Sequence, residues 1–344
     1  MKIPEKEKFQ KNPLTILQSE AVFSALKKLW ENNHLNVKNP EEFVLDFFDF
    51  LKSNPKSSEK EIKKYYGQKL KEHSSDDIDT DFKQDMFLQL IEKDLEGIGT
   101  VLDFGCGKLA FLKNIAENNK EIKNFIGVDP KSSPALENLD PRIRFERSLD
   151  KIEATSVDLV IVKLVLHHLE EAEIIKVFKE IKRVLRPDGK LIIFEESFFD
   201  CHPGPAPASL AESRRGGDPG SNESLGLSQG VRFRVKPGMT DINNKIIADT
   251  KKYLDGSGLE LAEEATSEFL KLSKEEKIQF LFLNDWLMNL QNKYMPWTLN
   301  YKSMEEWESI AGSAGFHLVE SHFLGAIKKR KRKQGMTVVL KFAK

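Results

Sequence analysis

The sequence predicts an α/β protein built on a doubly wound, mostly parallel sheet. Three observations point to this fold class. A buried strand around Val101 runs through a glycine turn into a helix with an apolar period. Short apolar strands and amphipathic helices then alternate up to Ser197, which is the pattern of parallel βαβ units with right-handed crossovers. Two more strands are expected at the C-terminal end, within residues 316–344.

Length and composition are those of one globular domain with additions. The chain has 344 residues, of which 31% are charged and 40% hydrophobic, so it can bury a large core. Its net charge of −1 gives no overall basic field of the kind that attracts nucleic acid. No apolar run approaches the length of about 18 residues that a membrane span needs, so we expect none.

Cysteine content and the first residues predict a cytoplasmic protein. Cys106 and Cys201 are the two cysteines, too few for a disulfide framework or a zinc site of their own. Residues 1–12 lack the apolar stretch of a secretory signal. A reducing cytoplasm is therefore the expected compartment.

Helical patterns dominate the N-terminal part of the chain. The segment Pro40 to Leu51 opens with a proline and two acids, which is typical of a helix start. A second helical pattern covers Glu61 to Leu70 and leads into a polar linker. A further helix is expected from Phe82 to Lys93, directly before the first strand.

The most informative segment is the strand and turn from Val101 to Leu112. Asp103 lies near the end of an otherwise apolar strand, which is a costly place for a carboxylate unless a polar group meets it. Gly105 and Gly107 let the backbone turn sharply and approach a ligand without a Cβ in the way. We therefore expect a cationic or hydroxyl-rich ligand across the tips of the strands.

The glycine pattern has a second interpretation. Gly105, Gly107 and Ala110 also fit the G-x-G-x-x-A pattern of dinucleotide-binding proteins. Asp103 argues against it, because a negative charge two residues before the first glycine disfavours a pyrophosphate at the turn. The segments downstream match a different family.

Four segments resemble, in order and spacing, the motifs of class I S-adenosylmethionine-dependent methyltransferases. They are DFGCG at Asp103–Gly107, FIGVDP at Phe125–Pro130, DLVIVKLVLHHLEE at Asp158–Glu171 and RVLRPDGKLIIFEES at Arg183–Ser197. The resemblance covers residues 79–198 and, more loosely, 300–344. It implies a Rossmann-like sheet of seven strands, mostly parallel with the last strand antiparallel, that binds S-adenosylmethionine.

The resemblance also implies which residues hold the cofactor. Asp129 would accept hydrogen bonds from the ribose diol, although Asp129-Pro130 is by itself a common turn start. Asp103 would face the ammonium of the methionine part, or else cap the turn that follows it. The two glycines would let the loop pass close to the adenosine. The full predicted set is Asp103, Phe104, Gly105, Cys106, Gly107, Asp129, Pro130, Ser148, Leu149 and Lys163.

Three of these positions follow later strands. The third strand is expected at Arg142–Arg147, after which the Ser148 hydroxyl and the Leu149 amide would reach the adenine. Lys163 follows the fourth strand, and we expect its ammonium to point away from the sulfonium of the cofactor; a solvated strand-end lysine is the alternative. Leu109 stands where the family often has a third glycine, and a leucine there is expected to narrow the approach of the loop to the ligand.

Candidate catalytic residues leave the fourth strand. His167 and His168 are expected next to the transferred methyl group, so either could be a general base; the other interpretation is a strand exit and helix cap. The Asn/Asp-Pro-Pro-aromatic motif that this superfamily uses for amide or exocyclic amine nitrogens is absent after this strand, as is a Pro-Cys nucleophile. We therefore predict methyl transfer to a small-molecule acceptor. The alternatives are a non-catalytic S-adenosylmethionine-binding scaffold and an RNA methyltransferase that uses the basic run Lys328–Lys333.

Five parts are expected along the chain. They are a helical region (1–78), the cofactor-binding core (79–198), an inserted, disordered loop rich in Pro, Gly and Ser (199–244), a helical cap (245–300), and a closing helix and hairpin (301–344). The first part either packs on the core or forms a lid over the substrate pocket, with Tyr65 and Tyr66 as the residues of interest. Trp286, Met295 and Trp297 are expected to be core residues or walls of an acceptor pocket.

Overall fold

A computed structural model gives the structure of the protein. It describes residues 19–30, 40–54, 56–72, 86–132, 134, 137, 139–199, 239–289, 300–329 and 332–344. The expectations for Cys201, Met295, Trp297 and most of the inserted loop lie outside these residues.

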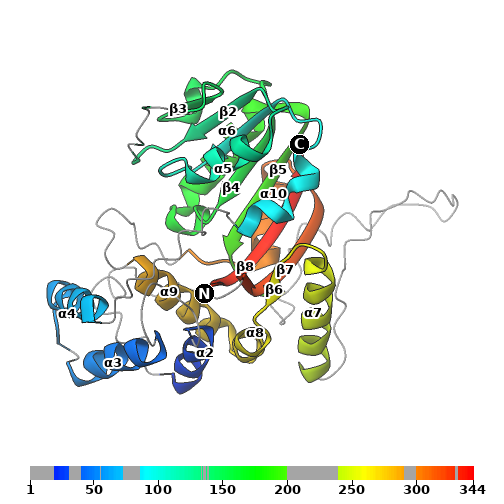
Figure 1. Ribbon diagram of the computed structural model, residues 1–344. Helices are drawn as coiled ribbons and strands as arrows, with labels where there is room; N and C mark the ends of the chain where they lie inside the picture. Colours follow the sequence, from blue (N-terminus) through cyan, green and yellow to red (C-terminus); the bar gives the residue numbers. More distant parts are fainter. Residues whose placement is uncertain are drawn as a thin grey trace, which may run out of the picture.

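An eight-stranded sheet organises the molecule (Figure 1). Its strands are β1 (Thr100–Phe104), β2 (Asn124–Val128), β3 (Ile143–Glu146), β4 (Val157–Lys163), β5 (Leu185–Glu196), β6 (Glu260–Leu261), β7 (His317–Lys329) and β8 (Arg332–Ala343). Their spatial order is β3-β2-β1-β4-β5-β8-β7-β6. Neighbouring strands among β1–β5 pair in parallel, and β8 is antiparallel to both β5 and β7. The expected fold class is confirmed, and the short β6 adds an eighth strand beside β7.

The register brings the carboxyl ends of four strands to one edge of the sheet. Phe104 at the end of β1 pairs with Val128 of β2 and with Val162 of β4, and Val128 pairs with Glu146 of β3. Strand order reverses between β1 and β4. Ligands of open α/β sheets bind outside the carboxyl ends of the strands at such a reversal, and the glycine turn follows β1 at this place.

Two connections differ in detail from the sequence expectation. The pairing of β4 with β5 shifts from Val157–Leu185 to Leu159–Lys190, so the predicted turn Arg186–Gly189 loops out within β5. At the C-terminal hairpin, Lys329 of β7 still pairs with Arg332 of β8. The basic run is therefore largely strand, because the two closing strands continue beyond the edge of the parallel sheet.

Helices flank the sheet. The helix α5 (Ala110–Asn118) follows the glycine turn, α6 (Glu171–Val184) connects β4 to β5, and α10 (Met304–Ser313) precedes β7. Both α6 and α10 begin with a capping box, in which the side chain three residues into the helix accepts from the backbone of the cap residue. Only the apolar stripe of α6 is buried, as expected for a helix lying on a sheet.

The prediction of an α-helix at Phe82–Lys93 is wrong for those of its residues that the structure describes. Residues 86–95 form two short 3₁₀ helices, η3 (Met86–Leu90) and η4 (Glu92–Leu95). Nearly every side chain of η3 is buried. Tertiary packing of η3 therefore outweighs the helical propensity of this segment.

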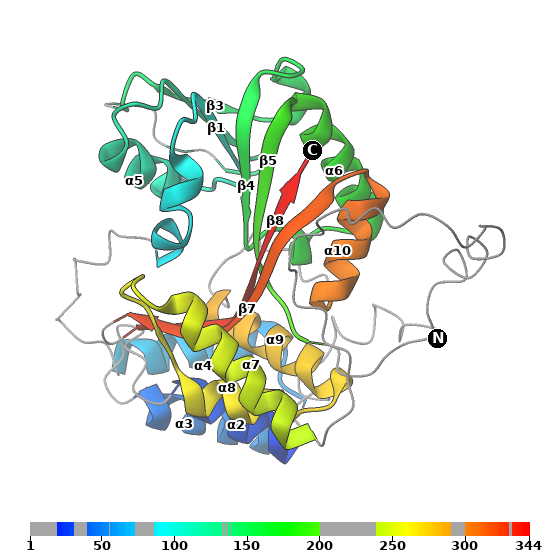
Figure 2. The same cartoon turned by 90° about the vertical axis from the view of Figure 1, so that its right-hand side faces the viewer.

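A group of helices gathers near the hairpin of β7 and β8 (Figure 2). Its members are α2 (Glu20–Trp30), α3 (Pro40–Ser53), α4 (Glu59–Glu72), α7 (Met239–Leu254), α8 (Glu263–Leu270) and α9 (Lys274–Asn289). The N-terminal helices are tied to α9: the hydroxyl of Tyr66 donates to the carbonyl of Leu287 at 2.8 Å, and the ring of Phe47 lies 5.8 Å from that of Trp286. Within the described part of the chain, no helix has the length and apolar character to cross a membrane.

Candidate active site

The glycine turn after β1 has backbone conformations that favour glycine. The φ angles of Gly105 and Gly107 are +79° and +53°. A Cβ on Gly105 would lie 2.2 Å from a methyl carbon of Val165, so a side chain there requires a shift of the loop after β4. The turn and the β4 exit are therefore packed directly against each other.

Leu109 does not narrow the approach to the turn, and that expectation is wrong. Its side chain is fully buried and points at β2, where a Cβ on Gly127 would lie 2.2 Å from its Cδ2 atom. The backbone of Leu109 has a φ of 66°, a conformation that glycine adopts at no cost. The glycine that the family often has at this position would suit this backbone conformation. In this chain the leucine side chain instead fills space next to Gly127.

Asp129 stabilises the turn by hydrogen bonds to backbone amides. One of its carboxylate oxygens accepts from the amide of Gly107 at 3.0 Å, and the other from the amides of Lys131 and Ser132 at 2.8 and 2.7 Å. These bonds are those of a strand-end turn residue. A carboxylate has about four acceptor positions, so the ribose contact remains a prediction beside this structural role.

Asp103 and Asp129 both lie near Cys106 in the turn. Burial raises the pKa of the Cys106 thiol, and the charges of Asp103 and Asp129 raise it further. Asp103 itself is only 2% exposed. The two acids that the sequence predicts at opposite ends of the cofactor thus lie close to one turn.

The remaining predicted cofactor residues have partners within the protein. The Ser148 hydroxyl bonds to the carboxylate of Asp150 and lowers its pKa, and the Leu149 carbonyl accepts from Arg183 at 2.7 Å. The Lys163 ammonium lies over the ring of Phe111, 4.4 Å from its centre. Phe104 is the last residue of β1, and Pro130 follows the end of β2.

A buried polar cluster lies at the exits of β4 and β5. His167, in the short helix η6 (Leu166–His168), is 2% exposed, and its Nδ1 lies 2.5 Å from Oε1 of Glu195. The other oxygen of Glu195 accepts from the amide of Leu166 at 2.6 Å. Glu195 therefore holds both the His167 ring and the backbone of η6 in place.

Helix α9 adds Asp285 to this polar cluster. Oδ2 of Asp285 lies 3.9 Å from Nε2 of His167 and 3.9 Å from Nδ1 of His168. The Tyr301 hydroxyl donates to the same oxygen at 3.2 Å, and its ring stacks on that of His167. The side chain of His168 is 12% exposed against 2% for His167, so His168 is the more accessible of the two.

Charges within the polar cluster influence one another strongly. Burial by itself lowers the pKa of His167, but the charges of Glu195 and Asp285 and the bond to Glu195 raise it to about 9. Burial and the charge of Asp285 raise the pKa of Glu196 to about 8. The surrounding carboxylates therefore favour the protonated imidazole of His167, which must give up its Nε2 proton before that nitrogen can act as a base or as a ligand.

The family comparison agrees with the motifs. Residues 102–193 match the family model described as a methyltransferase domain. These residues, from β1 into β5, are similar to a methyltransferase domain. No curated protein sequence matches the chain.

Solved structures with similar folds include several methyltransferases. An S-adenosylmethionine-dependent methyltransferase from Mesorhizobium loti has 15% identity and a TM-score of 0.40, with 76% of this chain and 98% of that chain covered. The mitomycin 7-O-methyltransferase MmcR has 10% identity and a TM-score of 0.40, covering 96% and 70%. The pyocyanin biosynthetic protein PhzM has 11% identity and a TM-score of 0.41, covering 89% and 64%.

Sequence reasoning missed the acids of the polar cluster. Glu195 and Glu196 end an apolar strand, and Asn284 and Asp285 interrupt the apolar run FLFLNDWL of α9. Buried polar residues inside apolar runs are the unusual observation in any sequence. That signal is present at both places, but it does not show that the two segments meet.

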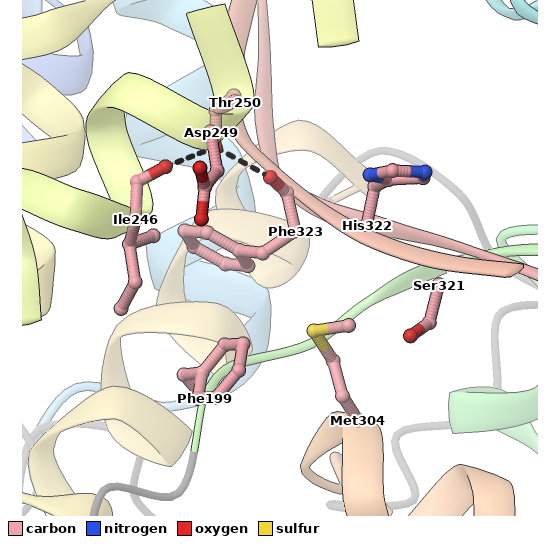
Figure 3. A pocket seen from close by; sticks show the side chains of 8 residues that line it. All are labelled: Phe199, Ile246, Asp249, Thr250, Met304, Ser321, His322 and Phe323. Carbon is pink, nitrogen blue, oxygen red and sulfur yellow. Dashed lines mark hydrogen bonds between the residues drawn. The ribbon is translucent and has the colours of Figure 1, made fainter. Parts of the chain in front are cut away.

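A separate pocket lies between α7, α10 and β7 (Figure 3). It is lined by Phe199, Ile246, Asp249, Thr250, Met304, Ser321, His322 and Phe323. The Thr250 hydroxyl bonds to the carbonyls of Ile246 and Phe323, so it is satisfied within the protein. None of the residues predicted to bind the cofactor lines this pocket.

Proposed function

We propose that the methyltransferase domain transfers the methyl group of S-adenosylmethionine to a small-molecule acceptor. The observation that carries this proposal is the position of the glycine turn. It lies at the reversal of strand order beside β1, next to Asp103 and Asp129, and packs through Val165 against the loop that carries the histidine pair. A cofactor on the turn would therefore present its methyl group to the polar cluster.

In this proposal the acids hold the two ends of the cofactor. Asp129 keeps its bonds to the turn and accepts the ribose hydroxyls with its remaining lone pairs. Asp103, buried at the end of β1, faces the cationic amino group of the methionine part. Phe104, Cys106, Pro130, Ser148, Leu149 and Lys163 complete the proposed set around the nucleoside.

The chemistry is an in-line displacement at the methyl carbon. The acceptor atom forms a bond to that carbon while the carbon–sulfur bond breaks, and the electron pair of that bond stays on sulfur, which becomes a neutral thioether. The proton of the acceptor group passes to a base of the polar cluster or to solvent. The protein contributes mainly alignment and the exclusion of water. Helix α9 takes part in both, because it supplies Asp285 to the polar cluster.

Calorimetry with the full-length protein tests cofactor binding. We expect wild type to bind S-adenosylmethionine and S-adenosylhomocysteine, and Asp103→Asn to bind both more weakly, because both compounds carry the cationic amino group that Asp103 is proposed to face. Asp255→Asn, an exposed acid after α7, is the matched control and should bind both as wild type does. Absence of binding to both compounds in folded wild type would reject the proposal.

Turnover separates an enzyme from a binding scaffold. Incubation with methyl-labelled cofactor and fractionated small-molecule acceptors should release S-adenosylhomocysteine and transfer label. Tight cofactor binding without product from any small-molecule fraction would support the scaffold alternative. Transfer of label to RNA, lost when Lys328 and Lys329 are neutralised, would support the RNA alternative instead.

A further inference from the structure

We propose that His167, His168 and Asp285 bind one divalent transition-metal cation, which holds an oxygen atom of the acceptor. The site is built from two parts of the chain that are far apart in sequence, the exit of β4 and helix α9. One ligand atom from each of the three side chains lies within 4.8 Å of the others. The role in acceptor binding rests on the proposed methyl transfer, whereas the cation site itself does not.

The distances are close to those of a coordination sphere. Nε2 of His167 and Nδ1 of His168 each lie 3.9 Å from the same oxygen of Asp285. Ligand atoms at about 2.0–2.2 Å from a metal lie roughly 3.3–3.5 Å apart in tetrahedral geometry. On metal binding the two His–Asp separations would contract by about 0.5 Å, and the two imidazole nitrogens, which lie within 4.8 Å of each other, would also have to approach.

Two of the three ligands, His167 and Asp285, are already oriented by other hydrogen bonds. Nδ1 of His167 is held by Glu195, which leaves Nε2 directed to the side of Asp285. Histidines that bind metals commonly use their other nitrogen in this way, on a carboxylate. Asp285 is in turn fixed through Oδ1 by the Asn289 side chain at 2.7 Å and through Oδ2 by Tyr301.

The charge of the polar cluster also favours a cation. Glu195, Glu196 and Asp285 are three buried carboxyl groups, and the two imidazoles that face them carry a charge of at most +2. Oε2 of Glu196 is buried and has no hydrogen-bond partner among the described residues. Its other oxygen accepts from Asn284, which is itself bonded to Trp30. These carboxyl groups outnumber the imidazoles, so they would attract a dication bound at the three ligands.

The donor set indicates which cations fit. Two imidazole nitrogens and one carboxylate oxygen suit zinc and its first-row neighbours such as cobalt and manganese, rather than calcium or magnesium, which prefer oxygen ligands. Three protein ligands also leave a coordination position open. An acceptor hydroxyl bound there would lose its proton to water more readily, so the histidines would act as ligands rather than as bases.

Metal binding can be measured without any acceptor. Full-length protein is treated with a chelator, dialysed, and titrated with Co²⁺ by visible absorption and with Zn²⁺ by calorimetry. We expect one equivalent to bind, with cobalt bands of a four- or five-coordinate site. His168→Asn and Asp285→Asn should each weaken binding at least about tenfold. Absence of stoichiometric binding in wild type, or unchanged binding in both variants, would overturn the inference.

Two controls make the result specific. His322→Asn removes a partly buried histidine that also contacts a carboxylate, Glu320, at 2.7 Å, and it should bind Co²⁺ as wild type does. Circular dichroism checks that each variant is folded; because His168 is the more exposed ligand, its variant serves if Asp285→Asn does not fold. Loss of binding in His322→Asn as well would also contradict the proposed site.

Calorimetry with S-adenosylmethionine on the same metal-free samples separates this inference from the proposed function. We expect cofactor binding to persist without the metal, because the glycine turn holds the cofactor and the polar cluster holds the cation. Wild type that binds cofactor but no cation would overturn the metal site and leave methyl transfer standing. Wild type that binds the cation but no cofactor would overturn methyl transfer alone.

Discussion

The side chain of Leu109 occupies the space that a Cβ on Gly127 would need. The distance from that Cβ position to Cδ2 of the leucine is 2.2 Å, and Cys106 Sγ lies 2.8 Å from the same position. Leu109 is fully buried in a left-handed backbone conformation. The absence of a side chain at Gly127 therefore makes room for the Leu109 side chain, and this contact positions the turn against β2.

Replacing Gly127 should disturb the turn. We expect Gly127→Ala to destabilise the protein by about 1–3 kcal/mol through overpacking, and the double variant Gly127→Ala, Leu109→Ala to lose less than the sum of the two single changes. Denaturant unfolding of the four proteins measures the interaction. Simple additivity of the two changes would show that the contact does not hold the turn in place.

Gly105 is expected to tolerate no side chain. Its positive φ and the nearby Val165 methyl carbons together predict that Gly105→Ala costs about 2–4 kcal/mol of stability and weakens S-adenosylmethionine binding. Gly312→Ala is the matched control, because its Cβ would meet no atom within 4 Å inside α10; it should stabilise by about 0.5–1 kcal/mol. Unfolding curves and calorimetry check both, and equal behaviour of the two variants would contradict the close packing of the turn.

Local sequence patterns were sufficient for the sheet and the turn but not for the polar cluster. β1, β2 and β4 are continuous apolar runs bounded by turn residues, which is the signal of buried parallel strands. Asp285 is conspicuous as a polar residue within an apolar run, but its approach to His167 depends on how α9 packs across the strand exits, a long-range contact that no local period encodes. The two-residue β6 is likewise too short to leave a pattern. The burial of the Leu109 side chain could not be predicted locally either, because it depends on the contact with Gly127 of β2.

The N-terminal helices can be tested as a packing element or a lid. The Tyr66 hydroxyl is buried on the carbonyl of Leu287, whereas the Tyr65 ring stacks on Phe50 at 3.9 Å. Tyr66→Phe leaves that carbonyl without this donor and should cost about 1–3 kcal/mol. If these helices only pack, cofactor affinity and turnover will stay unchanged at temperatures where the variant is folded. A raised KM for the acceptor at unchanged stability would instead support a lid.

Arg142 links the start of β3 to the end of α5, and its contribution should depend on pH. The guanidinium bonds to the carboxylate of Asp140 and to the carbonyls of Ala116, Asn119 and Ile122. The side-chain bonds from Arg142 lower the pKa of Asp140 from 3.8 to about 2. A carboxyl group whose pKa is lower in the folded state stabilises the protein above its unfolded pKa, and this contribution is lost as the pH falls through the folded value.

Comparison of wild type with Arg142→Met measures this dependence. We expect the variant to unfold at a lower denaturant concentration than wild type at pH 7, because it loses the bonds to the carboxylate and to the three carbonyls. The difference should shrink between pH 4 and pH 2, as Asp140 is protonated, and only the part due to the carbonyl bonds should remain. Arg144→Met, a neighbouring exposed arginine, is the matched control and should show no such trend. A difference that is constant from pH 7 to pH 2 would mean that Asp140 contributes nothing to holding this edge of the sheet.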